Sequence, residues 1–174
     1  MEKKFVLGVA HFNIQFIAGQ YETYHRVVRE SFSQVLDVLI DHPSWTFTFE
    51  IQGHMIEFMA EHYPHTLEKF KRLVKSGQVE FVSCHYSDQI FIAFPKSDMA
   101  KSIEMNDKVL KEHGLERSRI FYTQENFFGE GVAELSKDFS AAVVIDTYYN
   151  YFHEVRKTEP YLMLDKLKVL VSSG

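Results

Sequence analysis

The sequence predicts an α/β protein built on a parallel sheet, and three features support that class. Apolar runs alternate with amphipathic stretches from Phe5 to Ile145, which is the order expected of strands alternating with helices. Runs such as Phe5–Ala10 have no polar face, as expected of strands covered on both sides. The amphipathic stretches are long enough to cross over between parallel strands. About five βα units follow from this pattern, and the chain then continues into a tail hairpin.

Length and composition limit what the chain can be. With 174 residues it can bury one sizeable core, so we expect a single domain over residues 1–174. A formal net charge of -5 argues against a nucleic-acid partner or an anionic membrane surface. No stretch approaches the ~20 apolar residues of a membrane helix. Cys84 is the only cysteine, which excludes an internal disulfide and favours a reducing, cytoplasmic location.

The first half of the chain shows clear element signals. A helix is expected from Tyr21 to about Asp41, where His42-Pro43 ends the pattern. Its apolar residues recur three or four positions apart and form one stripe. The stripe consists of Tyr24, Val27, Val28, Phe32, Val35, Leu36 and Leu39. After the strand Phe5–Ala10 and this helix, the expected elements are the strand Trp45–Ile51, the helix His54–Tyr63 ending before Pro64, the helix Thr66–Lys75 stopped by Gly77, and the strand Val79–Cys84.

The second half repeats the alternation. Pro95, Ser97 and Asp98 resemble a helix start, and Gly114 follows the predicted helix end at His113. The remaining expected elements are the strand Ile120–Thr123, a helix opening near Gly129 with Val132, Leu135 and Phe139 on its inner face, the strand Ala141–Ile145, and the tail hairpin formed by Tyr161–Leu164 and Leu167–Val171.

Polar side chains follow the predicted strands at their carboxyl ends. In a parallel sheet these ends share one rim, so residues far apart in sequence should converge there. Glu125 is the clearest candidate, because a carboxylate between a buried strand and a helix lies where α/β folds place chemistry. A solvated loop acid or a helix-start charge is the structural alternative. The predicted rim residues are His11, Asn13, Glu50, His54, His85, Asp88, Gln124, Glu125 and Asp146.

Three chemistries fit this rim poorly. A metal site needs three or four His, Cys, Asp or Glu ligands, whereas His11-Phe-Asn13 offers an amide, which is a weak ligand for transition metals. Cys84 fits a packed strand residue better than a reactive thiolate. The phosphate-binding patterns Gly-x-x-x-x-Gly-Lys and Gly-x-Gly-x-x-Gly do not occur. We therefore expect neither a metal nor a cofactor.

Carboxylate chemistry fits the rim better. A retaining glycosidase uses one carboxylate as nucleophile and a second as acid/base, beside groups that bind sugar hydroxyls and aromatic rings that stack on the sugars. Glu125, Asp146 and Glu50 are the candidate carboxylates, and Tyr148 is a candidate aromatic contact. For most of the aromatic residues, ordinary core packing is the alternative. An oligosaccharide or polysaccharide is the expected partner.

Three motifs occur in order along the chain. They are His11-Phe-Asn13-Ile-Gln15 after the first strand, Gly77-Gln78-Val79-Glu80, and Phe121-Tyr-Thr-Gln-Glu125. They resemble the His-x-His-Gln-Pro motif, the Gly-Gln-hydrophobic-Glu motif and the strand ending in glutamate of glycoside hydrolase family 57, which includes α-amylases, 4-α-glucanotransferases and branching enzymes. The strand Ala142–Asp146 also resembles the family strand that ends at the sugar site.

The resemblance implies a parallel-stranded partial (β/α) barrel of the glycoside hydrolase and deacetylase type. The chain would be the N-terminal portion of a (β/α)7 glycosidase barrel, truncated after about five βα units plus a tail hairpin. The resemblance also implies that Glu125 is the nucleophile of a retaining reaction on α-glucan or a related oligosaccharide. His11, Asn13 and Glu80 would line the sugar subsite. From its strand position alone, Glu80 also fits a buried acid paired across strands.

Two departures from the family pattern leave alternatives open. Asn13 stands where the family has a second histidine, and an amide cannot titrate near neutrality. The family's general acid is an aspartate on a later strand, past Gly174, so we expect slow or no turnover by the isolated chain. The alternatives are a non-catalytic carbohydrate-binding or assembly module and an open flavodoxin-like sheet that binds a small molecule. An open sheet edge also predicts self-association into a homo-oligomer.

Overall fold

A computed structural model of the chain describes residues 8–14, 20–90, 93–122, 124–126, 134–135, 138–145, 161–163 and 167–172. Contacts divide the chain into two compact units. The first comprises Met1–Ile51 and Met55–Phe81, and the second comprises Gln52–His54 and Val82–Gly174. The described strands fall into one three-stranded and one four-stranded sheet. The expectation of a single domain over residues 1–174 stays a prediction.

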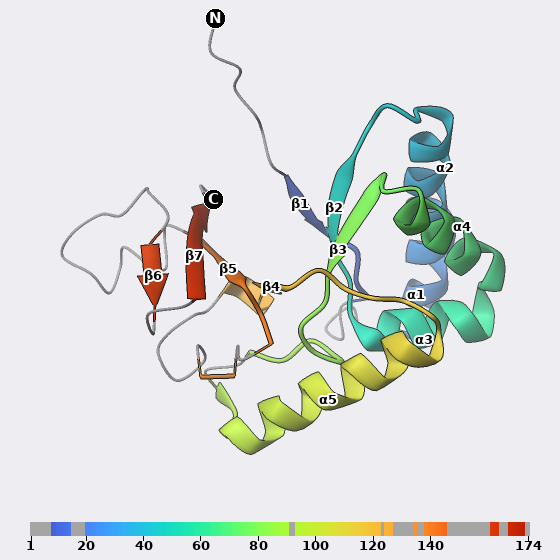
Figure 1. The fold of residues 1–174 in the computed structure, drawn as a ribbon. Helices are drawn as coiled ribbons and strands as arrows, with labels where there is room; N and C mark the ends of the chain where they lie inside the picture. Colours follow the sequence, from blue (N-terminus) through green and yellow to red (C-terminus); the bar gives the residue numbers. More distant parts are fainter. Residues whose placement is uncertain are drawn as a thin grey trace, which may run out of the picture. The chain divides into compact units, whose positions relative to one another are not determined.

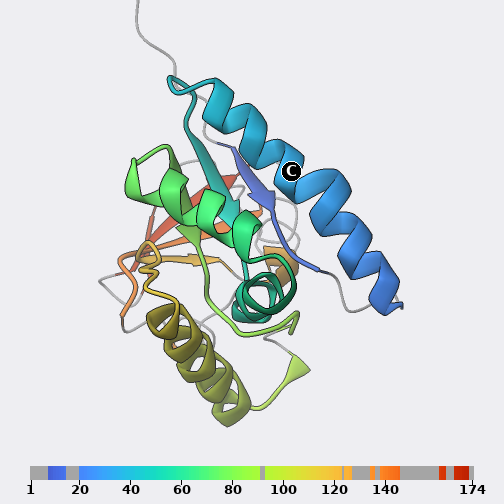
Figure 2. The ribbon, with the colours of Figure 1, turned by 90° about the vertical axis from the view of Figure 1, so that its right-hand side faces the viewer.

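The first unit is a small sheet with helices against one face (Figures 1 and 2). Strands β1 (Val9–His11), β2 (Phe47–Glu50) and β3 (Val79–Val82) lie in the order β1-β2-β3. β1 pairs with β2 in parallel, and this register sets His11 opposite Glu50. The parallel pairing brings the carboxyl ends of the two strands to the same edge of the sheet. The described part of the predicted first strand begins at Gly8, and residues 5–7 lie outside the described residues.

Residues 21–41 form one continuous helical stretch, as predicted, with a π-helical turn at its centre. Helix α1 (Tyr21–Val27) passes through the π turn Val28–Phe32 into α2 (Ser33–Asp41). The buried side chains are Val28, Phe32, Leu36 and Leu39. A π turn has a wider repeat than an α-helix: Val28, Phe32 and Leu36 follow one another at four-residue spacing through the turn, and Leu39 comes three residues later. Val35, which was predicted in the apolar stripe, is instead 38% exposed.

Helices α3 (Gly53–His62) and α4 (Pro64–Lys75) follow each other with one residue between them. Pro64 was predicted to end the first of these helices. It also begins α4, which therefore starts two residues before the predicted Thr66. Proline suits the first helical position because the N–H that it lacks would have no partner inside the helix. Gly77 follows α4 with a φ of +76°, which confirms its predicted role as the helix stop.

The second unit holds a four-stranded sheet and the 17-residue helix α5 (Lys96–Glu112). Its strands β4 (Ile120–Tyr122), β5 (Ala141–Ile145), β6 (Tyr161–Met163) and β7 (Leu167–Ser172) lie in the order β4-β5-β7-β6. β5 is parallel to β4 and β7, whereas β6 and β7 are antiparallel. The predicted α/β class with parallel strands and the tail hairpin are confirmed. None of the helices in the described ranges is both long and apolar enough to cross a membrane.

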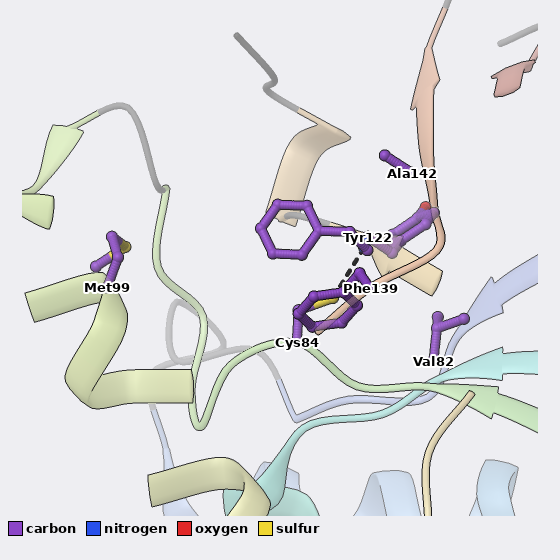
Figure 3. Packing of buried hydrophobic residues seen from close by; sticks show 7 residues of the cluster. Val82, Cys84, Met99, Tyr122, Phe139 and Ala142 are labelled. Atoms are coloured by element: carbon purple, nitrogen blue, oxygen red, sulfur yellow. Dashed lines mark hydrogen bonds between the residues drawn. The ribbon is translucent and has the colours of Figure 1, made fainter. Parts of the chain in front are cut away.

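The core of the second unit forms around Cys84 (Figure 3). This side chain is fully buried, and its Sγ accepts a hydrogen bond of 2.8 Å from the backbone N–H of Tyr122 in β4. The interpretation of Cys84 as a packed residue is confirmed, although it lies two residues after β3 and not within it. The buried cluster consists of Val82, Cys84, Met99, Phe121, Tyr122, Phe139 and Ala142.

Gly53 lies at a point of close packing in the second unit. A Cβ atom at this position would approach Asn106 Oδ1 to 2.8 Å and Tyr86 Cδ2 to 3.2 Å. Asn106 is fully buried, and its Nδ2 donates to the carbonyl oxygen of Ser83 at 3.2 Å and to the Ser83 hydroxyl at 3.0 Å. A larger residue at position 53 would displace Asn106, and because that displacement would break these buried hydrogen bonds, it would cost free energy.

We expect Gly53→Ala to lower the free energy of unfolding by about 1–3 kcal/mol, as overpacking of a filled site typically does. Urea denaturation followed by circular dichroism measures this loss. The matched control is Gly8→Ala, because no atom lies within 4 Å of a Cβ built there. Equal effects of the two substitutions would contradict the close contact at Gly53.

Candidate functional site

Two side chains at and just after the carboxyl end of β1 contact one carboxylate at the end of β2, and we call His11, Asn13 and Glu50 the strand-end trio. The His11 Nδ1 lies 2.9 Å from Glu50 Oε2. Asn13 Nδ2 donates a hydrogen bond to the same carboxylate oxygen. The His11 side chain is 44% exposed, whereas that of Glu50 is 1% exposed. The carboxylate of Glu50 is therefore buried, and the imidazole of His11 is the solvent-accessible member of this pair.

The alternation of side chains along the strands explains this arrangement. Phe12 and Phe49 lie one position away from the paired residues His11 and Glu50, and their rings contact each other with centroids 4.5 Å apart. Successive residues of a strand point to opposite faces. The phenylalanines therefore fill the face that the helices cover, where Phe12 also stacks on Phe32 of the π turn. His11 and Glu50 occupy the other face.

Glu80 lies on the same face of the first sheet as His11 and Glu50, opposite the helices. Its neighbour Phe81 packs against Phe70 of α4 with ring centroids 5.4 Å apart, so Glu80 points away from the helices. The Glu80 side chain is exposed. It is the second residue of β3 and so lies before the carboxyl end of that strand. The alternative that Glu80 is a buried acid paired across strands is wrong.

Burial makes the Glu50 carboxylate costly unless donors compensate it. An ionised carboxylate is stable inside a protein when hydrogen bonds or an opposite charge replace its water. The imidazole of His11 and the amide of Asn13 supply two contacts at Oε2. Oε1 is buried without a hydrogen-bond partner among the described residues. A group kept at such a cost is a candidate for a functional role.

In the second unit, Glu125 follows β4 with an unusual backbone. Its φ of 55° and ψ of 12° lie in the left-handed region, and no other non-glycine residue in the described ranges has a positive φ. That conformation costs about 1–2 kcal/mol for a residue with a Cβ, and such strain clusters at functional sites. The Glu125 side chain is exposed, and Gln124 Nε2 donates to its Oε1 at 3.4 Å.

A further group of polar residues connects the segments after β2 and β3. Gln52, which is 2% exposed, donates through Nε2 to Asp88 Oδ1. The backbone N–H of His54 donates to the carbonyl oxygen of Tyr86 at 2.8 Å, and the rings of His54 and Tyr86 lie 5.9 Å apart. Gln52 was absent from the predicted rim. Its signal in the sequence is a polar residue two positions after Glu50 and directly before Gly53.

The structure brings some predicted residues together and leaves others apart. The strand-end trio belongs to the first unit, whereas His54, Gln124 and Glu125 belong to the second. The convergence of Glu125 on His11 and Asn13 therefore stays a prediction. Asp146 and Tyr148 lie outside the described residues. Within the described ranges, no three His, Cys, Asp or Glu side chains are grouped as metal ligands.

Comparison with known proteins identifies the family. The profile of glycosyl hydrolase family 57 matches residues 9–172. The chain is 24% identical to the alpha-amylase of Pyrococcus horikoshii over 124 residues, which are 71% of this chain and 20% of that protein. It is 26% identical to the 4-alpha-glucanotransferase of Thermococcus litoralis over 152 residues, which are 86% of this chain and 22% of that protein. The chain thus spans about a fifth of the length of these relatives.

Solved structures show the same fold. The 4-alpha-glucanotransferase of Thermococcus litoralis superimposes with a TM-score of 0.82 at 17% identity, over 96% of this chain and 27% of that one. A peptidoglycan deacetylase from Bacillus subtilis superimposes with a TM-score of 0.53 at 12% identity, over 77% of this chain and 56% of that one. The fold is the partial barrel that glycoside hydrolases and polysaccharide deacetylases share. With its profile match over nearly the whole length, the chain belongs to glycosyl hydrolase family 57.

Proposed function

We propose that this chain is the nucleophile-bearing part of a retaining enzyme that hydrolyses or transfers α-glucan or a related oligosaccharide. Membership of family 57, and the names of the amylase and glucanotransferase relatives, support the substrate class. The observation that carries the assignment of Glu125 is its left-handed backbone three residues after the end of β4. A strained non-glycine residue at the carboxyl end of a strand is typical of an active site.

In this proposal the exposed Glu125 carboxylate attacks the anomeric carbon and forms a covalent glycosyl–enzyme intermediate. A second carboxylic acid, which we expect on a later strand, protonates the departing glycosidic oxygen. The same group then acts as a base and takes a proton from the incoming nucleophile. Water as that nucleophile completes hydrolysis, whereas a sugar hydroxyl completes transfer.

The sugar-binding residues of the proposal are His11, Asn13 and Glu80. Two observations support them: His11 is partly exposed, and Glu80 is exposed on the same face of the first sheet. The further predicted contacts are His54, Gln124, Asp146 and Tyr148. Glu50 is too deeply buried to reach a sugar directly, so in this proposal it acts through its neighbours.

A non-catalytic carbohydrate-binding module is the second candidate. Asn13 favours it, because an amide replaces the second histidine of the family motif. An amide still binds a hydroxyl, but it cannot gain or lose a proton near neutrality. The two candidates differ in whether the carboxylate of Glu125 is needed for turnover or is incidental to binding.

We expect Glu125→Gln to reduce kcat on maltoheptaose by about 10⁴-fold or more, as loss of a nucleophile typically does. The substitution is made in an enzyme that contains residues 1–174 together with the strand that supplies the general acid. The amide has nearly the same shape but is a poor nucleophile, so the Kd for maltoheptaose should stay within about threefold. Product release measured by chromatography and binding measured by calorimetry give the two quantities. Glu116→Gln, an exposed acid of the same unit, is the matched control and should leave both unchanged.

Wild-type protein that binds maltoheptaose without turning it over, with Glu125→Gln binding equally well, would favour the binding module. If the wild type is active, proton NMR of the first product should show a retained anomeric configuration. Inversion would contradict the covalent step, because a single displacement by water reverses the configuration.

The backbone of Glu125 generates a separate prediction about stability. Glu125→Gly and Glu125→Ala both remove the carboxylate, but only glycine adopts a positive φ without a steric cost. We expect the glycine variant to be more stable than the alanine variant by about 1 kcal/mol, after the entropy cost of glycine is counted. Urea denaturation of the two variants measures the difference. A less stable glycine variant would show that residue 125 is not in the left-handed region.

A further inference from the structure

We infer that Glu50 is the positioning residue of the sugar subsite: its buried carboxylate fixes the tautomer of His11 and the amide orientation of Asn13. This inference rests on the proposed function for its link to sugar. The placement of the three side chains rests on contacts within the first unit alone. Glu50 lies at the end of β2, opposite His11 in the parallel register.

The chemistry of the contact sets the tautomer. An ionised carboxylate has no hydrogen to donate and can only accept. The ring nitrogen of His11 that lies 2.9 Å from Glu50 Oε2 must therefore carry the hydrogen. In the neutral imidazole this makes Nδ1 the donor and Nε2 the acceptor. The carboxylate thus selects the Nδ1–H tautomer of a side chain that is 44% exposed.

The same logic orients Asn13. Its amide donates to Glu50 Oε2 through Nδ2, because the amide oxygen would meet another acceptor there. The Oδ1 atom of Asn13 consequently points away from the carboxylate. With Nδ1 of His11 and Nδ2 of Asn13 directed at the carboxylate, the other polar side-chain atoms of the two residues, Nε2 and Oδ1, are both acceptors. Such a subsite recognises sugar hydroxyl groups that donate hydrogen bonds.

Burial distinguishes this role from direct binding. The Glu50 side chain is 1% exposed, and it is the shared contact of both neighbours. Positioning groups of this kind hold contacting side chains within the narrow range of geometry that binding requires. Loss of the carboxylate should therefore alter the trio without removing an atom that touches the ligand.

The decisive experiment reads the imidazole nitrogens of His11 by ¹⁵N NMR, under alkaline conditions in which histidine side chains are neutral. The His11→Gln variant identifies the signal by its absence. In the wild type we expect Nδ1 to be protonated and Nε2 unprotonated. Glu50→Leu places an apolar side chain of similar size in the buried position and removes the acceptor. In this variant the Nε2–H form that free histidine prefers should dominate. Glu50→Gln retains an acceptor oxygen and should preserve the Nδ1–H form.

Calorimetry with maltoheptaose, on the full chain, measures the Kd for sugar as the second test. We expect the Kd of Glu50→Leu to rise about tenfold, which corresponds to ~1.4 kcal/mol, and that of Glu50→Gln to rise less. Glu30→Gln, an exposed acid of the π turn, is the matched control and should change neither the tautomer nor the Kd. Circular dichroism verifies that each variant is folded.

The outcomes separate the two proposals. A wild-type Nδ1–H tautomer that Glu50→Leu reverses, in a protein that binds no α-glucan, supports the positioning of His11 and contradicts the proposed function. An unchanged tautomer in folded Glu50→Leu overturns the positioning role, whatever the sugar affinity. Selective loss or shift of the His11 signals on adding Zn²⁺ would also overturn it, because the trio would then be a set of metal ligands.

Discussion

The parallel pairing of β1 with β2 is the constraint on which the candidate site depends. Its register places His11 opposite Glu50 at the ends of the two strands. A slip by one residue would turn Glu50 toward the helix-covered face, because side chains alternate between faces. Phe12 and Phe49, packed together on that face, oppose such a slip. The hydrophobic face of the sheet thus holds the polar face in position.

The two units use different devices to place polar groups at strand ends. In the first, a buried carboxylate is shared by two neighbours, which both contact the same oxygen. In the second, Gln124 and Glu125 follow a strand anchored in the core by the contact of Cys84 with Tyr122. There the chain turns through a left-handed residue, at a cost in local stability. The packed strand β4 and its core supply the stability that sustains the strained residue.

Much of the fold could be predicted from local signals. Helices end at Gly77 and Gly114 because glycine adopts a positive φ without steric cost. The strands β4 and β5 follow from their short apolar runs. Other features depend on tertiary packing. A π turn is not encoded by any one residue type, so the exposure of Val35 could not be foreseen.

The same division holds for the candidate site. The shared edge of parallel strands predicted that His11, Asn13 and Glu50 would lie near one another, but not that Glu50 would be buried beneath the other two. The left-handed backbone of Glu125 had no signal, because glutamate seldom adopts it. The contact of Gln52 with Asp88 links segments 36 residues apart in sequence. The spacing of residues along the chain does not predict such a long-range pair.

A crystal structure of the Glu125→Gln variant with bound maltoheptaose is the sharpest test of the proposed sugar site. We expect a sugar ring whose hydroxyl groups donate hydrogen bonds to His11, Asn13 and Glu80, with the side chain at position 125 about 3–3.5 Å from an anomeric carbon. A sugar bound elsewhere, or a side chain at position 125 far from every anomeric carbon, would contradict it.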